Sequence, residues 1–134
     1  MGEGTPGAVT LPVGGLGRLR KLAHDAAPAE CCGVLLGNRG AVSEIREVRN
    51  VAGRGRFEMD PDDLFAVLAA ADDERLDVVG SFHSHPGGRA EPSDVDEAGA
   101  VPGWLTVVIG RRRVRAWSIG PSGRSEVPLL ERTW

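Results

Sequence analysis

The chain has 134 residues, of which 41% are hydrophobic and 26% charged, a composition that supports one folded domain over 1–134 and excludes a disordered protein. Sixteen basic and nineteen acidic residues leave a formal net charge of −3, too small to favour nucleic acid or a membrane surface as the main partner. We therefore expect a single-domain protein with no nucleic-acid and no membrane partner.

The two cysteines, Cys31 and Cys32, are neighbours in the sequence. Adjacent cysteines rarely form a disulfide, so the chain has no disulfide framework and suits a reducing compartment. The first residues lack the charged start and apolar run of a signal peptide, and no segment approaches the roughly 20 apolar residues of a membrane span. These features predict a cytoplasmic location, with Cys32 as a packed free thiol.

The first part of the chain predicts one helix and two or three strands. Apolar residues recur at helical spacing over 16–27, and the predicted helix stops near Pro28. The apolar run 31–37 indicates a buried strand, and a glycine-bounded turn joins it to a second strand over 41–50. The segment 54–60 is interpreted as a further short strand.

A second helix has the clearer signals. Asp60 is suited to cap it, Pro61 suits its first position, and two further acids favour the positive end of its dipole. Its predicted apolar face consists of Leu64, Val67, Leu68 and Ala71. A strand over 77–85 follows.

The last part of the chain predicts a short helix within 92–100 and strands over 104–110, 113–119 and 125–130. This order of elements indicates an α/β (α+β) fold, with a central sheet flanked by helices. No glycine-rich phosphate loop follows a strand, so the chain has no nucleotide-binding motif. The basic run 111–115 is interpreted as a solvated hairpin tip, or as a contact for an acidic partner.

Two of the three histidines lie within three residues, as His83 and His85. On a strand they project from the same face and form half of a zinc site. If a helix starts at Ser93, Asp96 falls on its first turn and can complete three protein ligands, which leaves one position for water. Each of these residues also has an explanation that involves no metal. Ser93 and Asp96 could simply form the start of a helix, with Ser93 as its cap, and His83 and His85 could be ordinary surface or core histidines.

Peptide hydrolysis also needs a carboxylate near the metal that moves protons without binding the ion. Glu30, at the start of the first predicted strand, is the candidate, although it also fits a surface glutamate at a strand edge. The glutamates that compete for this role are Glu44, Glu47, Glu58, Glu74, Glu91 and Glu97.

The sequence AECCGVLLG at 29–37, followed by HSHPGGRAEPSDVD at 83–96, resembles the compact prokaryotic type of the JAMM (MPN-plus) metallopeptidases. The family pattern is a glutamate ahead of an apolar strand, then His-x-His-Pro, six residues and Ser-x-x-Asp, and every position matches. The resemblance implies a cytidine-deaminase-like architecture with a mixed, mostly antiparallel curved sheet.

The resemblance also implies a role for each residue of the motif. His83, His85 and Asp96 would bind one Zn²⁺ per chain, and Glu30 would be general base and then general acid. Ser93 would stabilise the developing oxyanion by a hydrogen bond. The serine between the two histidines would be buried support.

JAMM enzymes cut amide or isopeptide bonds after the C-terminal glycines of ubiquitin-like proteins. The resemblance therefore implies, as partner, a small ubiquitin-like or sulfur-carrier protein ending in Gly-Gly, which is released from a protein or from an amino acid such as cysteine. The enzyme would act as a monomer or homodimer. The alternatives are a metal-free scaffold of the same fold and a zinc hydrolase of small molecules.

Overall fold

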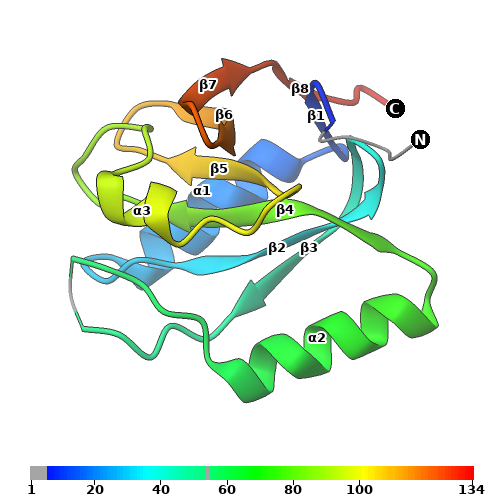
Figure 1. The fold of residues 1–134 in the computed structure, drawn as a ribbon, viewed down its shortest axis with the longest axis horizontal. Coiled ribbons are helices and arrows are strands. Elements are labelled where there is room, and N and C mark those ends of the chain that lie inside the picture. Colours follow the sequence, from blue (N-terminus) through cyan, green and yellow to red (C-terminus); the bar gives the residue numbers. More distant parts are fainter. Residues whose placement is uncertain (1–5, 54) are drawn as a thin grey trace.

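A mixed sheet, eight-stranded over the described residues, runs through the protein in the order β7-β6-β5-β4-β2-β3-β1-β8 (Figure 1). The computed structural model describes residues 6–53 and 55–134. The strands are β1 (Val9–Leu11), β2 (Cys32–Asn38), β3 (Ala41–Val48), β4 (Asp77–Ser84), β5 (Leu105–Ile109), β6 (Val114–Gly120), β7 (Gly123–Val127) and β8 (Leu129–Glu131). The helices are α1 (Gly15–Ala26), α2 (Pro61–Asp73) and α3 (Asp94–Ala98).

The two long helices cover opposite faces of the sheet (Figure 1). Alternate side chains of β2 explain how, because successive residues of a strand point to opposite faces. Leu35 belongs to the core beneath α1, whereas Val34 and Leu36 pack with the apolar side of α2. β2 is therefore buried on both faces, and it holds the centre of the sheet together with β4.

The sheet is mixed and curved, as expected. β1 pairs in parallel with β3 and β8, and β4 with β5, whereas the pairs β2–β3, β2–β4, β5–β6 and β6–β7 are antiparallel. β7 and β8 lie at opposite ends of the strand order, yet only Pro128 separates them in the chain. The Pro128 carbonyl accepts a hydrogen bond from the Val9 N–H at 2.9 Å. The sheet thus bends back until its two ends approach.

The predicted helices are confirmed. The first spans Gly15–Ala26, and the second begins at Pro61, where the Asp60 carboxylate accepts a hydrogen bond from the Asp62 N–H at 3.4 Å. The short helix is confirmed as Asp94–Ala98. No helix in the described part of the chain is long and apolar enough to cross a bilayer.

Two strand predictions need correction, and one further strand was not predicted. The strand expected over 54–60 is wrong for its described residues, of which only Met59 forms a bridge, with Asn50; position 54 lies outside the described residues. The single strand over 125–130 is divided into β7 and β8, because Pro128 has no N–H to donate to a strand ladder. β1 escaped prediction because its three residues are too few to show an alternation.

Candidate metal centre

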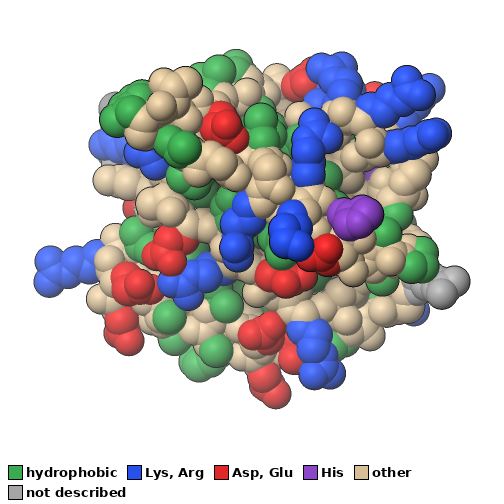
Figure 2. Space-filling view, turned by 180° about the vertical axis from the view of Figure 1, so that it is seen from behind, with side chains coloured by type: hydrophobic (Ala, Val, Ile, Leu, Met, Phe, Trp, Pro, Cys, Tyr) green, Lys and Arg blue, Asp and Glu red, His purple; other side chains and the backbone are tan. Residues whose placement is uncertain are grey.

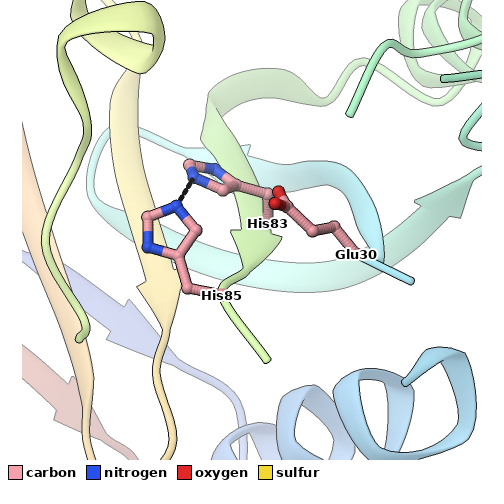
Figure 3. Close-up of side chains that lie close together, drawn as sticks. All are labelled: Glu30, His83 and His85. Carbon is pink, nitrogen blue, oxygen red and sulfur yellow. Dashed lines mark hydrogen bonds between the residues drawn. The ribbon is translucent and has the colours of Figure 1, made fainter. Parts of the chain in front are cut away.

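His83 and His85 lie at the end of β4, in the middle of the sheet. His83 pairs with residues of both neighbouring strands, and its side chain is 1% exposed. β4 ends at Ser84, one residue earlier than predicted, but the His85 N–H donates to the Ile109 carbonyl at 2.9 Å and keeps the backbone aligned with the sheet. Both rings therefore project to the same side, with 3.1 Å between their Nε2 atoms (Figure 3).

Asp96 reaches this pair from the first turn of α3. The Ser93 hydroxyl accepts a hydrogen bond from the Asp96 N–H at 3.1 Å, and the Asp96 carboxylate accepts one from the Ser93 N–H at 2.8 Å. This reciprocal capping box fixes the Asp96 side chain. Its Oδ2 atom lies 2.9 Å from His83 Nε2 and 3.1 Å from His85 Nε2. Asp96 therefore converges on the two histidines.

The three atoms suit a zinc ion. A tetrahedral zinc with ligands at about 2.0–2.1 Å holds them about 3.3 Å apart. Here the separations of the two Nε2 atoms and the carboxylate oxygen are 2.9, 3.1 and 3.1 Å. Imidazole nitrogen and carboxylate oxygen are also donors that zinc accepts. Both the spacing and the chemistry of the donor set fit the metal.

The two histidine rings are oriented in different ways. His85 Nδ1 lies 3.0 Å from the Arg89 carbonyl oxygen, which can only accept, so Nδ1 carries a hydrogen and Nε2 is turned toward His83 and Asp96. His83 Nδ1 is buried and has no hydrogen-bond partner among the described residues. Its ring is instead stacked on Phe57, with 4.4 Å between the ring centroids. Packing therefore holds His83, and a hydrogen bond holds His85.

Glu30 faces the same point from the chain just before β2 (Figure 3). One carboxylate oxygen of Glu30 and ring nitrogens of His83 and His85 all lie within 4.8 Å of one another. The side chain is 7% exposed. Burial raises the pKa of the Glu30 carboxyl, although the two histidines oppose the change. A carboxylate with a raised pKa takes up a proton more readily, as a general base must.

The remaining groups around the centre agree with this arrangement. Burial on its own would raise the pKa of Asp96, but hydrogen bonds from His83 and His85 outweigh it and hold the pKa of this carboxyl well below its usual range. Ser84 is buried, as predicted, and its Oγ accepts the Cys31 N–H at 2.8 Å. This hydrogen bond fixes the start of β2 beside the end of β4.

Ser93 is the exposed member of the predicted site. Its hydroxyl oxygen accepts the Asp96 N–H, so its own hydrogen is free to donate to another group. The helix-cap interpretation of Ser93 is confirmed, and it is compatible with a second role.

Four of the six competing glutamates form ion pairs elsewhere in the structure. Glu44 and Glu74 pair with Arg46, Glu91 pairs with Arg115, and Glu97 pairs with Arg124. Of the predicted acidic candidates, Glu30 and Asp96 are brought to the histidines.

Two contributors to the site were missed from the sequence. Phe57 was assigned to the predicted strand 54–60, and Asn50, whose amide donates to the Glu30 carbonyl, to the end of the predicted strand 41–50.

An apolar cavity of about 230 Å³ adjoins His83, and its walls include Phe57, Leu64 and Trp104. Short-range periodicity carries no signal for such contacts, since they join segments that are distant in the sequence.

Comparison with known proteins agrees with the fold. The chain is 35% identical over 111 residues to the desampylase of Haloferax volcanii, which covers 77% of this chain and 80% of that protein. A solved structure from Desulfitobacterium hafniense superposes with a TM-score of 0.83 at 24% identity, covering 92% of each chain. A JAB1/MPN domain protein from Archaeoglobus fulgidus superposes with a TM-score of 0.60 at 18% identity, covering 92% of this chain and 100% of that one.

These likenesses define a JAMM/MPN-type protein, as the motif had indicated. Residues 12–120 match the family model described as prokaryotic homologs of the JAB domain, and the chain belongs to that family.

Proposed function

We propose that this protein is a zinc-dependent peptidase that hydrolyses the amide bond after the C-terminal Gly-Gly of a ubiquitin-like or sulfur-carrier protein. The observation that carries the proposal is the triangle formed by His83 Nε2, His85 Nε2 and Asp96 Oδ2, with sides of 2.9–3.1 Å and the Glu30 carboxylate beside it. The proposal extends to a single domain over 1–134 and a reducing, cytoplasmic location, which the two free buried cysteines favour.

His83, His85 and Asp96 would hold one zinc ion. When bound, the ion would act as a Lewis acid toward the scissile carbonyl group and a water molecule. Glu30 is buried and adjacent to the two histidines, so its carboxylate is suited to take the proton of the attacking water. The same carboxyl group, now protonated, would deliver that proton to the amine that leaves.

Ser93 would donate its hydroxyl hydrogen to the oxygen on which negative charge develops. Its backbone position is fixed by the capping box, so the donor needs little reorganisation during the reaction. Removal of such a preorganised donor typically costs about 10²–10³ in kcat.

The substrate class is supported by the relative named desampylase and by the family pattern of the motif. A glycine tail suits a confined site because glycine has no side chain to clash there. The released group would be a protein lysine or a free amino acid such as cysteine, and the enzyme would work as a monomer or homodimer.

Zinc analysis and cleavage assays test the proposal together. The purified protein should contain zinc in about equal amount to the chain. His83→Ala should lose the metal, whereas Glu30→Gln should keep it and lose turnover of a ubiquitin-like protein fused through Gly-Gly to a reporter peptide. A folded wild type that binds no zinc would favour the metal-free scaffold instead. Zinc-loaded protein that cleaves no Gly-Gly fusion would contradict the peptidase assignment.

A further inference from the structure

A basic cleft lies next to the candidate metal centre and takes no part in the roles proposed above. It has a volume of about 410 Å³ and lies between the loop 87–91, which follows His85, and the β5–β6 turn. We call it the arginine cleft. Its lining residues are Gly87, Gly88, Arg89, Ala90, Glu91, Arg111, Arg112, Arg113 and Arg115.

The charge of the cleft is largely uncompensated. Arg115 is neutralised, because Glu126 holds it with contacts of 2.7 and 2.9 Å and Glu91 with one of 3.2 Å. Four other arginines of the cleft have no carboxylate of the described residues at salt-bridge distance. They are Arg89, Arg111, Arg112 and Arg113.

The walls of the cleft are tied to each other. The Arg111 N–H donates to the Gly88 carbonyl at 2.8 Å, which joins the β5–β6 turn to the loop. Trp117 Nε1 donates to the Ala90 carbonyl at 2.9 Å, and the Arg115 guanidinium lies 4.6 Å from the centre of the same indole ring. The main chain that carries the positive groups is therefore preformed, which reduces the entropy lost when a partner binds.

The cleft adjoins the site at His85. His85 Nδ1 is hydrogen-bonded to the Arg89 carbonyl at 3.0 Å, so one loop carries both a proposed metal ligand and a wall of the cleft. Figure 2 shows Lys and Arg side chains gathered toward the upper right, which corresponds to the upper left of Figure 1, where the chain passes from β5 to β6. Four unpaired positive charges on a chain of net charge −3 form a local field opposite in sign to that of the whole molecule.

We propose that the arginine cleft receives an acidic surface of the ubiquitin-like carrier while the carrier's tail enters the metal centre. This inference rests on the proposed function and deepens it, because it specifies that the contact surface of the partner is negatively charged. A carrier whose tail occupies the metal centre must place its folded domain against the neighbouring surface. Charged groups at the edge of an interface chiefly set the rate of association and the choice of partner.

Charge reversal tests the proposal. Arg112→Glu should raise the KM for an acidic ubiquitin-like protein, fused through Gly-Gly to a reporter peptide, by about tenfold at low salt. The difference from wild type should shrink between about 50 mM and about 500 mM NaCl, because salt screens exposed charges. kcat should stay within about twofold. A ubiquitin-like fusion of net positive charge should respond in the opposite direction.

Arg75→Glu is the matched control. It makes the same change of charge at an exposed position after α2, away from the cleft, and should leave the KM unchanged. A short peptide that represents only the Gly-Gly tail and reporter should be cleaved equally by wild type and Arg112→Glu. Equal KM values for Arg112→Glu and Arg75→Glu, or an equal loss with the short peptide, would overturn the inference.

Failure of the proposed function gives a different result. If the wild type cleaves no fusion at all, the peptidase assignment fails. Binding to the arginine cleft can then still be measured by fluorescence anisotropy with the labelled acidic ubiquitin-like protein. Binding that weakens about tenfold in Arg112→Glu, and not in Arg75→Glu, would support the acidic partner. Absence of binding, or unchanged Kd values, would reject it.

Discussion

The side-chain amide of Asn50 donates a hydrogen bond to the main-chain carbonyl of Glu30, with 3.0 Å between the two atoms. The same amide group donates to the Arg56 carbonyl at 3.2 Å, and the side-chain oxygen accepts two main-chain N–H groups of the segment 52–58 at 2.9 and 3.0 Å. One side chain thus joins the backbone of the proposed general base to the segment that carries Phe57.

Asn50→Ala should therefore reduce activity more than it reduces metal binding. In this variant the Glu30 main-chain carbonyl loses its hydrogen-bond donor, so the Glu30 side-chain carboxylate should lose its fixed position. We expect kcat to fall by about tenfold or more. Loss of these hydrogen bonds should also cost about 1–3 kcal/mol in the free energy of unfolding. Zinc content should remain that of the wild type. Asn50→Asp keeps the acceptor and removes both donors, so a kcat as low as that of Asn50→Ala would assign the effect to the donors; wild-type kcat in both variants would contradict it.

Removal of the Phe57 ring should weaken metal binding. Phe57 is stacked on His83, whose Nδ1 has no hydrogen-bond partner in the described part of the chain, so stacking helps to orient the ring. Phe57→Ala should weaken zinc affinity by about tenfold in a competition titration with a chelator. Phe65→Ala, which removes a ring that is 74% exposed on α2, is the control and should leave the affinity unchanged. Equal affinities for the two variants would show that stacking does not orient His83.

Both thiols should be unreactive in the folded protein. Burial raises the pKa of Cys32 to about 12 and also raises that of Cys31. The reactive thiolate is therefore scarce at pH 8, and a colourimetric thiol reagent should detect two thiols only after addition of denaturant. Because the folded-state pKa of Cys32 lies above the ordinary thiol value of 9.0, the free energy of unfolding should fall as the pH rises from about 9 toward about 12. Rapid native labelling of either thiol would contradict this expectation.

Two glycine substitutions should change stability in opposite directions. A Cβ atom at Gly80 would overlap the Leu105 carbonyl on the neighbouring strand, whereas one at Gly17 in α1 would meet nothing within 4 Å. Gly80→Ala should lower the free energy of unfolding by about 1–3 kcal/mol. Gly17→Ala should raise it by about 0.5–1 kcal/mol, because alanine favours the helix. Thermal denaturation followed by circular dichroism compares them, and a Gly80→Ala variant as stable as wild type would reject the close approach of β4 and β5.

The parts of the site that depend on local geometry were predictable from the sequence. His83 and His85 share a face because strand residues alternate, and Asp96 is placed by the helix cap three residues earlier. Glu30 needed more than periodicity, because its position depends on the pairing of β2 with β4 across a long separation in sequence. The motif resemblance distinguished it from the other glutamates.

Features that depend on long-range pairing were not predictable. β1 has three residues, and it is a strand because it pairs with β8 and β3. The segment around Phe57 has an aromatic residue and alternating polarity, which are typical of a strand, but Asn50 occupies its main-chain groups instead. Local sequence patterns do not show which hydrogen-bond partner a main-chain N–H or C=O group will have in the folded protein.

β4 and β2 each have three strands on one side and four on the other, so together they are the strands farthest from the edges of the sheet. Interior strands are generally the last to open, and their amide hydrogens exchange most slowly with deuterium. His83 therefore belongs to the most persistent part of the fold. Extraction of the ion and loss of the native state should be separate events, so a chelated sample could be recharged with metal without passing through refolding.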